Sequence, residues 1–182
     1  MHGLIVNQLR QYVVTKYDRE TWEKLRLGTG VAIGEGAVPI NAIYPDEDVV
    51  AIVKAASEAT GIPAAALLED FGAFIAPALL RVYEPLIPKA WGTLDILEHT
   101  EETIHTVVRR HDGGIALPPY LKVERASPAL AIVEYTSPRR LCDVARGIVR
   151  GISEELRERV EIEQPECMMR GDSRCLLRVS QP

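Results

Sequence analysis

Apolar residues recur at the three- and four-residue spacing of amphipathic helices along the first two-thirds of the chain. The pattern opens with Leu4, Ile5, Leu9, Tyr12 and Val13. It resumes after Asp18, whose side chain can cap a second helix. The segment 28–45 is rich in glycine and proline, and it predicts a loop.

Three further helical patterns lie over 46–60, 64–83 and 91–110. Gly61 follows the first pattern and is typical of a helix end. Pro77 lies inside the second, where a proline removes a backbone hydrogen bond, so we expect a kink or a split there. The first two-thirds of the chain is therefore predicted to be helical.

The period of the apolar residues changes to two after Pro118 and Pro119. Alternation predicts strands over 121–125, 131–135, 160–163 and 175–179, with one helix over 139–157 between the second and third strands. We therefore expect an α+β fold: an N-terminal helical subdomain and a C-terminal antiparallel sheet flanked by helices.

Composition narrows the class of protein. The 182 residues carry a net charge of −5 and are 47% hydrophobic, which suits one soluble domain with a sizeable core. This acidic balance argues against nucleic acid as a partner. No apolar run reaches the ~18–20 residues that cross a bilayer. Three cysteines without a secretory signal indicate a cytoplasmic protein whose thiols are free or bound to a metal.

Tyr135, Ser137 and Arg139 follow an alternating strand at two-residue spacing. Residues two apart share one face of an extended chain, so two hydroxyl groups and one guanidinium can converge. This set suits a carboxylate or phosphate ligand. The alternative is a strand end with solvated polar groups.

Histidines are the candidate ligands for a metal or a haem iron. His105 lies at the edge of the apolar stripe of the 91–110 helix, and His99 and His111 compete with it. Taken alone, each is more often a partly exposed helix residue with a satisfied ring than a ligand. Gly147 and Gly151, one turn apart in the next helix, indicate close approach of something flat or of another backbone; helix packing alone also explains them.

Cys142, Cys167 and Cys175 form the remaining candidate site. Gly171 and Asp172 predict a turn that brings Cys167 and Cys175 together. Three thiolates could hold zinc with a fourth ligand; three buried free cysteines are the alternative. Familiar catalytic motifs are missing, which favours a binding module over an enzyme.

Together these features resemble one family, the bacterial branch of the H-NOX (haem-nitric oxide/oxygen binding) domains, related to the sensor domain of soluble guanylate cyclase. The chain starts Met1-His2-Gly3-Leu4-Ile5-Val6, like the M-x-G-x-I/V start of that family. Tyr135-x-Ser137-x-Arg139 matches its Y-x-S-x-R motif, and Gly147 to Gly151 matches its G-L-x-x-G run. The resemblance covers nearly the whole chain, as a single domain whose distal helical part is 1–62 and whose remainder is 63–182.

The resemblance implies a haem b cofactor between the two parts. His105 would be the axial ligand of the iron, and Tyr135, Ser137 and Arg139 would bind the haem propionates. Pro119 would press on the porphyrin. The other residues implied to line it are Ile5, Ile75, Leu79, Leu121, Val144, Ile148 and Ile152. Some members also hold zinc on three cysteines and a histidine; Gln164 stands at the histidine position here, so Glu166 or water would have to substitute.

The implied function is gas sensing at a five-coordinate ferrous haem that binds nitric oxide and CO. Nitric oxide would weaken the iron–His105 bond and release its helix, and a separate histidine kinase, cyclase or chemotaxis protein would detect the change. Oxygen-binding members carry a tyrosine at the Val144 position and a polar residue at the Ile75 position, so stable O2 binding is not expected here. Tyr12 or Tyr83 would be the alternative hydroxyl donors.

Two other functions compete with this one. The first is a haem-free ligand-binding domain or zinc-organised scaffold of related fold. The second is a small enzyme with Cys142 or Cys175 as nucleophile, for which no neighbouring base is visible in the sequence.

Overall fold

Helices α1 (Gly3–Lys16), α2 (Arg19–Thr29), α3 (Asp46–Thr60) and the start of α4 (Ala64–Tyr83) build residues 1–71. The computed structural model describes the chain except for residues 32, 34–37, 40–41 and 112–117. The N-terminal cap of α2 is the predicted one, because Asp18 Oδ1 accepts a hydrogen bond from the Thr21 N–H at 2.6 Å. Gly61 ends α3 with a φ of 71°, as the sequence predicted.

The core of this first unit is formed by residues from all four helices. Fully or nearly fully buried are Val6, Leu9, Tyr12, Val13, Trp22, Leu25, Val49, Ile52, Val53, Leu67 and Phe71. The Tyr12 hydroxyl donates to Asp70 Oδ2 at 2.7 Å, and the Tyr12 ring packs at an angle on Phe71. Tyr12 thereby joins α1 to α4.

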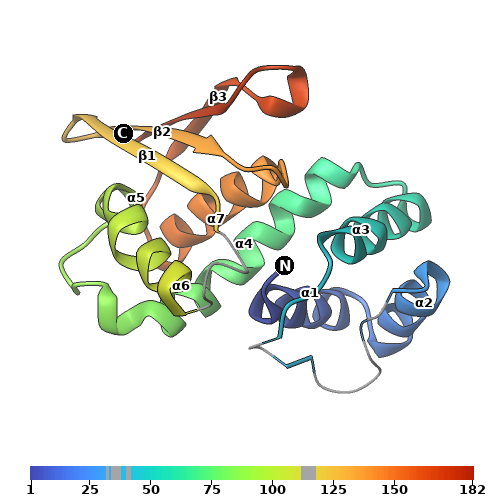
Figure 1. Cartoon of the computed structure of the whole chain (residues 1–182). Helices are drawn as coiled ribbons and strands as arrows, with labels where there is room; N and C mark the ends of the chain where they lie inside the picture. The colour runs from blue at the N-terminus through green and yellow to red at the C-terminus, as the bar shows by residue number, and fades with distance from the viewer. Residues whose placement is uncertain (32, 34–37, 40–41, 112–117) are drawn as a thin grey trace. The chain divides into compact units, whose positions relative to one another are not determined.

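Residues 72–182 form the second unit, into which α4 continues (Figure 1). Its helical elements are η1 (Glu84–Leu86), α5 (Thr93–Thr100), η2 (Glu101–His105), α6 (Thr106–His111), α7 (Cys142–Glu155) and η3 (Met168–Arg170). Its strands are β1 (Tyr120–Ser127), β2 (Leu130–Thr136), β3 (Glu161–Glu166) and β4 (Cys175–Ser180). They pair in the order β1-β2-β4-β3 and are all antiparallel.

Helices α5 and α7 pack on one face of this sheet. The shared core consists of Leu94, Leu97, Ala131, Val133, Val149, Leu177 and Val179. The α+β prediction is thus confirmed, with helices first and an antiparallel sheet interrupted by a helix. Among the described residues no single helix is long and apolar enough to cross a membrane, and one bent pair, α3 with 64–86, passes that test only jointly.

Pro77 does not split α4, which runs unbroken from Ala64 to Tyr83. The helix loses one backbone hydrogen bond there, but the turn before the proline packs firmly: Ile75 and Ala76 are both completely buried. Packing of this turn offsets the local cost of the proline, and sequence periodicity alone does not report such packing.

The paired glycines of α7 meet the backbone of α4. A Cβ atom built on Gly151 would lie 2.5 Å from the Ala73 carbonyl oxygen and 2.7 Å from the Ala76 Cβ. Gly72 makes the matching approach from α4, against the Val144 carbonyl oxygen and 2.9 Å from the Gly147 Cα. The glycines of α7 were expected to allow close approach of a flat group or of another backbone, or to reflect helix packing alone. The structure shows close backbone packing between α4 and α7.

Candidate functional site

His105 lies at the end of a π turn, η2, which interrupts the helical run predicted over 91–110. In this turn the Thr106 N–H donates to the Glu101 carbonyl, and the Thr106 hydroxyl donates to the same oxygen at 3.1 Å. The extra residue in the turn changes the face on which the following side chains project. Isolated π turns occur frequently at functional sites.

One carboxylate, that of Glu101, organises the surroundings of His105. Glu101 Oε2 lies 2.9 Å from His105 Nδ1 and accepts the Leu121 N–H at 3.0 Å. Glu101 Oε1 pairs with Arg109 at 2.7 Å, and Arg109 also donates to the Pro119 carbonyl at 3.3 Å. The His105 side chain is only 13% exposed, and its contact with Glu101 leaves Nε2 for a metal.

Burial and charge both act on this pair. Burial lowers the pKa of His105, while Glu101 opposes that shift. Burial alone would raise the pKa of Glu101, but hydrogen bonds from His105, the Leu121 N–H and Arg109 outweigh it and the pKa falls. A neutral imidazole beside an ionised carboxylate is the protonation state that suits a metal-ligating histidine.

Tyr135 and Ser137 are buried where β2 ends, and Arg139 is half-buried just beyond. The Arg139 N–H donates to Ser137 Oγ at 3.3 Å. Burial raises the pKa of Tyr135 to about 12, against hydrogen bonds from the Ser137 hydroxyl and the Leu141 N–H, so its phenol stays protonated. These groups can donate to a carboxylate ligand, which is what haem propionates require.

The antiparallel register joins these groups across the sheet. Leu121, whose N–H Glu101 accepts, lies opposite Tyr135, and Tyr135 lies opposite Cys175. The surroundings of His105, the Tyr135 motif and the cysteines are therefore neighbours along one row of the sheet.

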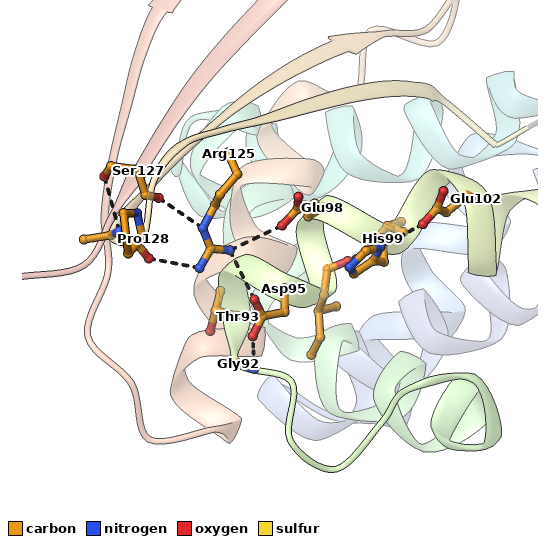
Figure 2. Close-up of polar contacts among 12 residues, drawn as sticks. Gly92, Thr93, Asp95, Glu98, His99, Glu102, Arg125, Ser127 and Pro128 are labelled. Carbon is orange, nitrogen blue, oxygen red and sulfur yellow. Dashed lines mark hydrogen bonds and ion pairs between the residues drawn. The ribbon is translucent and has the colours of Figure 1, made fainter.

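His99 and His111 are the other two candidate histidines, and the surroundings of His99 differ from those of His105. His99 stacks on Trp91 with ring centroids 4.5 Å apart, binds Glu102 through Nδ1 at 2.7 Å, and has a side chain 36% exposed. Its contact with Glu102 is drawn in Figure 2, and its side chain is more exposed than that of His105. His111 ends α6, and its side chain lies outside the described residues.

Arg125 fastens the other end of the same helical run to β1 (Figure 2). Its guanidinium donates to Asp95 Oδ1 at 3.3 Å and lies 3.7 Å from Glu98 Oε2. Asp95 Oδ2 in turn accepts the Gly92 N–H at 3.0 Å, which caps α5. Sequence reasoning missed this contact and the role of Glu101.

The residues implied to line a porphyrin lie in the second unit, on three elements and just before one of them, except Ile5, which is half-buried on α1 of the first unit. Ile75 and Leu79 are on α4, Pro119 precedes β1, and Leu121 is on β1. Val144, Ile148 and Ile152 are on α7. The last two pack with Ala76 and Ile96 in one apolar cluster.

Cys142, Cys167 and Cys175 are buried with their sulfur atoms within 4.8 Å of one another. Burial raises the pKa of Cys142 to about 12 and also raises that of Cys175. Burial acts the same way on Cys167, but backbone N–H groups of Met169 and Arg170 outweigh it and lower its pKa. Gln164 on β3 has a buried side-chain nitrogen without a hydrogen-bond partner.

A family model described as haem-NO-binding (HNOB) matches residues 2–164, nine-tenths of the chain. The chain belongs to the haem-NO-binding family. Members of this family bind haem, bind gas ligands and regulate associated signalling proteins. The predicted family is thus confirmed, together with the expectation of a sensor domain rather than an enzyme.

A curated relative is soluble guanylate cyclase gcy-35 of Caenorhabditis elegans, 24% identical over 161 residues. The match covers 86% of this haem-NO-binding chain and 23% of the relative, so the chain spans about a quarter of that protein.

Solved structures share the fold. The crystal structure of an H-NOX protein from S. oneidensis in the Fe(II)NO ligation state matches with a TM-score of 0.91 and 22% identity, over 100% of this chain and 99% of that one. An unliganded Fe(II) H-NOX mutant from K. algicida matches with a TM-score of 0.87 and 19% identity, over 100% and 97% of the two chains.

Proposed function

We propose that this protein is a sensor of nitric oxide and CO in which His105 binds the iron of haem b. The observation that carries the proposal is the buried pair of His105 and Glu101, because a carboxylate on Nδ1 fixes the tautomer that presents Nε2 to a metal. His99 lacks this burial, since it stacks on Trp91 at the surface.

Tyr135, Ser137 and Arg139 are proposed to bind the propionates. Tyr135 and Ser137 are buried at the end of one strand, and the backbone N–H of Arg139 donates to Ser137 Oγ, so the Arg139 guanidinium is proposed to add a charge-assisted donor. Pro119 would contact the porphyrin, because its carbonyl is tied through Arg109 to the same Glu101 that holds His105. Ile5, Ile75, Leu79, Leu121, Val144, Ile148 and Ile152 are the proposed apolar lining.

Haem supplies a ferrous iron whose open position binds a diatomic gas. The apolar side chains of Val144 and Ile75 provide no hydrogen bond to stabilise bound O2, whereas nitric oxide and CO need none. The Tyr12 hydroxyl already donates its hydrogen bond to Asp70, so it is not proposed as a donor to O2. We therefore propose selectivity for nitric oxide and CO over O2.

The signal is proposed to pass to a separate cytoplasmic protein such as a histidine kinase, a cyclase or a chemotaxis protein. Gas binding would change the balance of two conformations, which the partner would detect. The contacts of Glu101 support this proposal, because this carboxylate connects His105, the candidate iron ligand, to Leu121 of β1.

The experiment is the absorption spectrum of the ferrous protein, alone and with nitric oxide, CO and O2. We expect a Soret band, shifts with nitric oxide and CO, and no stable oxy spectrum in air. His105→Gly should lose haem unless imidazole is added, and His99→Gly should keep it. A colourless wild type, or haem loss in His99→Gly alone, would overturn the assignment.

Zinc on Cys142, Cys167 and Cys175 is a second proposal, which the clustering of the three sulfur atoms favours. Because Gln164 stands at the position of the fourth ligand, Glu166 or a water molecule would have to complete the set. A colourless protein that holds zinc would instead support a haem-free scaffold. Metal analysis tests this: less than about one zinc in ten chains would contradict it, given how tightly structural sites bind.

A further inference from the structure

The Glu101 carboxylate contacts groups on three elements of the second unit. A single carboxylate reaches a side chain on its own helical turn, an arginine on α6 and a backbone N–H on β1. The Leu121 N–H and His105 Nδ1 meet the same oxygen, Oε2, at 3.0 and 2.9 Å. Any displacement of His105 that preserves its bond to Glu101 therefore also acts on β1.

Strand β1 is at the edge of the sheet, so alternate N–H groups along it have no partner strand. Leu121 uses one such group, and its partner is the Glu101 side chain rather than backbone. Among the described residues, polar side-chain contacts join the helical run to β1 at two places, in addition to the apolar packing of Leu121 and Val123 on the cluster of Leu94 and Leu97. Arg125 with Asp95 and Glu98 forms one, shown in Figure 2, and Glu101 with Leu121 forms the other.

Of these two polar contacts, only that between Glu101 and Leu121 also includes His105. Arg109 reinforces it, because the same guanidinium group binds Glu101 Oε1 and the Pro119 carbonyl, two residues before Leu121. The segment 119–121 is therefore held to Glu101 both directly and through Arg109.

We infer that Glu101 is a positioning residue that orients His105 and links it mechanically to the segment 119–121 at the start of β1. The inference rests on the proposed function insofar as His105 is taken as the iron ligand. Beyond that function, it names the route by which a change at His105 reaches the sheet, through Leu121 to Tyr135 opposite it.

The test compares Glu101→Gln and Glu101→Ala with Glu98→Gln, in which the same chemical change removes an ion pair to β1 that does not involve His105. Glu101→Asp keeps the charge on a shorter side chain and serves as the conservative variant. Two readouts are used, one with haem and one without.

In the ferrous haem protein, resonance Raman spectroscopy measures the iron–histidine stretching band. We expect Glu101→Gln and Glu101→Ala to shift this band to lower frequency, because an uncharged or missing acceptor makes the imidazole less basic. Glu98→Gln should leave it at the wild-type value, and Glu101→Asp should lie between. An unshifted band in both Glu101→Gln and Glu101→Ala would overturn the positioning role.

In the haem-free protein, amide hydrogen exchange at Leu121 reports the link to β1 directly. Glu101→Ala should speed this exchange about tenfold or more, the factor that loss of a hydrogen bond to a charged group gives. The amides of Ala131 and Val133 in the centre of the sheet should be unchanged, and so should Leu121 in Glu98→Gln. Equal Leu121 exchange in wild type and Glu101→Ala would overturn the link.

The two readouts separate the possible failures. A wild type without an iron–histidine band refutes the proposed ligand while the exchange measurement still decides whether Glu101 holds β1. A wild-type band with no effect of Glu101 substitutions refutes the inference alone.

Discussion

Tyr135 on β2 lies directly opposite Cys175 on β4, and both side chains belong to one buried cluster with Cys142 and Cys167. The tyrosine of the proposed propionate site thus packs against the proposed zinc ligands. Because packed clusters transmit small displacements, occupation of one site is expected to affect the other.

Gln164→His is expected to strengthen zinc binding by about tenfold or more, because a fourth protein ligand completes a tetrahedral set and even outer-shell partners change metal affinity 10–100-fold. Competition with a chelator measures the zinc dissociation constant. Gln181→His is the control, since Gln181 binds Glu158 instead. Equal affinities in the two variants would argue against a zinc site at the cysteines.

Arg139→Ala is expected to release haem roughly 10–100-fold faster, because hydrogen bonds to charged groups contribute about 1.5–3 kcal/mol. Transfer of haem to an excess of a scavenging protein gives the rate, and circular dichroism checks that the fold is intact. Arg159→Ala removes an exposed arginine and should leave the rate unchanged. Identical rates in the two variants would remove the case for a site at Tyr135, Ser137 and Arg139.

Val144→Tyr is expected to give a stable oxy spectrum in the ferrous protein, with O2 dissociation slowed about tenfold by a new hydrogen bond. Val144→Phe is the matched control, because it adds nearly the same volume to this buried position without a hydroxyl group. Flash photolysis and stopped-flow absorption measure the rates. A stable oxy form in the wild type, or equal O2 behaviour in both variants, would contradict an apolar ligand site.

Gly151→Ala is expected to lower the free energy of unfolding by about 1–3 kcal/mol, the usual cost of overpacking, because its Cβ would meet the Ala73 carbonyl at 2.5 Å. Gly28→Ala has nothing within 4 Å and lies inside α2, so it should raise stability by up to about 1 kcal/mol. Urea unfolding compares the two. A Gly151→Ala variant as stable as wild type would show that α4 and α7 can separate without cost.

Much of this fold is encoded locally and could be predicted. Asp18 caps α2 and Gly61 ends α3 because capping depends on one side chain or one φ angle. The strands were recognisable because buried and exposed residues alternate along them, as in β2. The period of two holds as far as Tyr135, but β2 ends at Thr136 and a turn follows, so the joint role of Tyr135, Ser137 and Arg139 stays a prediction.

Other features depend on contacts distant in sequence. The π turn at Glu101 to His105 leaves the spacing of Leu94 and Leu97 unchanged, so periodicity gave no sign of it. Glu101 stands four residues before His105, a spacing that brings helical side chains together. That signal was present, but the contact with Leu121 requires the folded sheet. Of the two outcomes expected at Pro77, the split was wrong for the same reason, since burial of its neighbours offsets its local cost, and the kink stays a prediction.

The π turn also has a consequence for insertions and deletions in this helix. An α-helix advances about 100° per residue, so one extra residue rotates everything after it by that angle. The π turn absorbs one extra residue, so deleting a single residue between Glu101 and His105 would restore a regular helix and leave α6, with Arg109, facing Glu101 as before. The same deletion within the regular helix α5 would instead rotate His105 and α6 by about 100° relative to the start of α5.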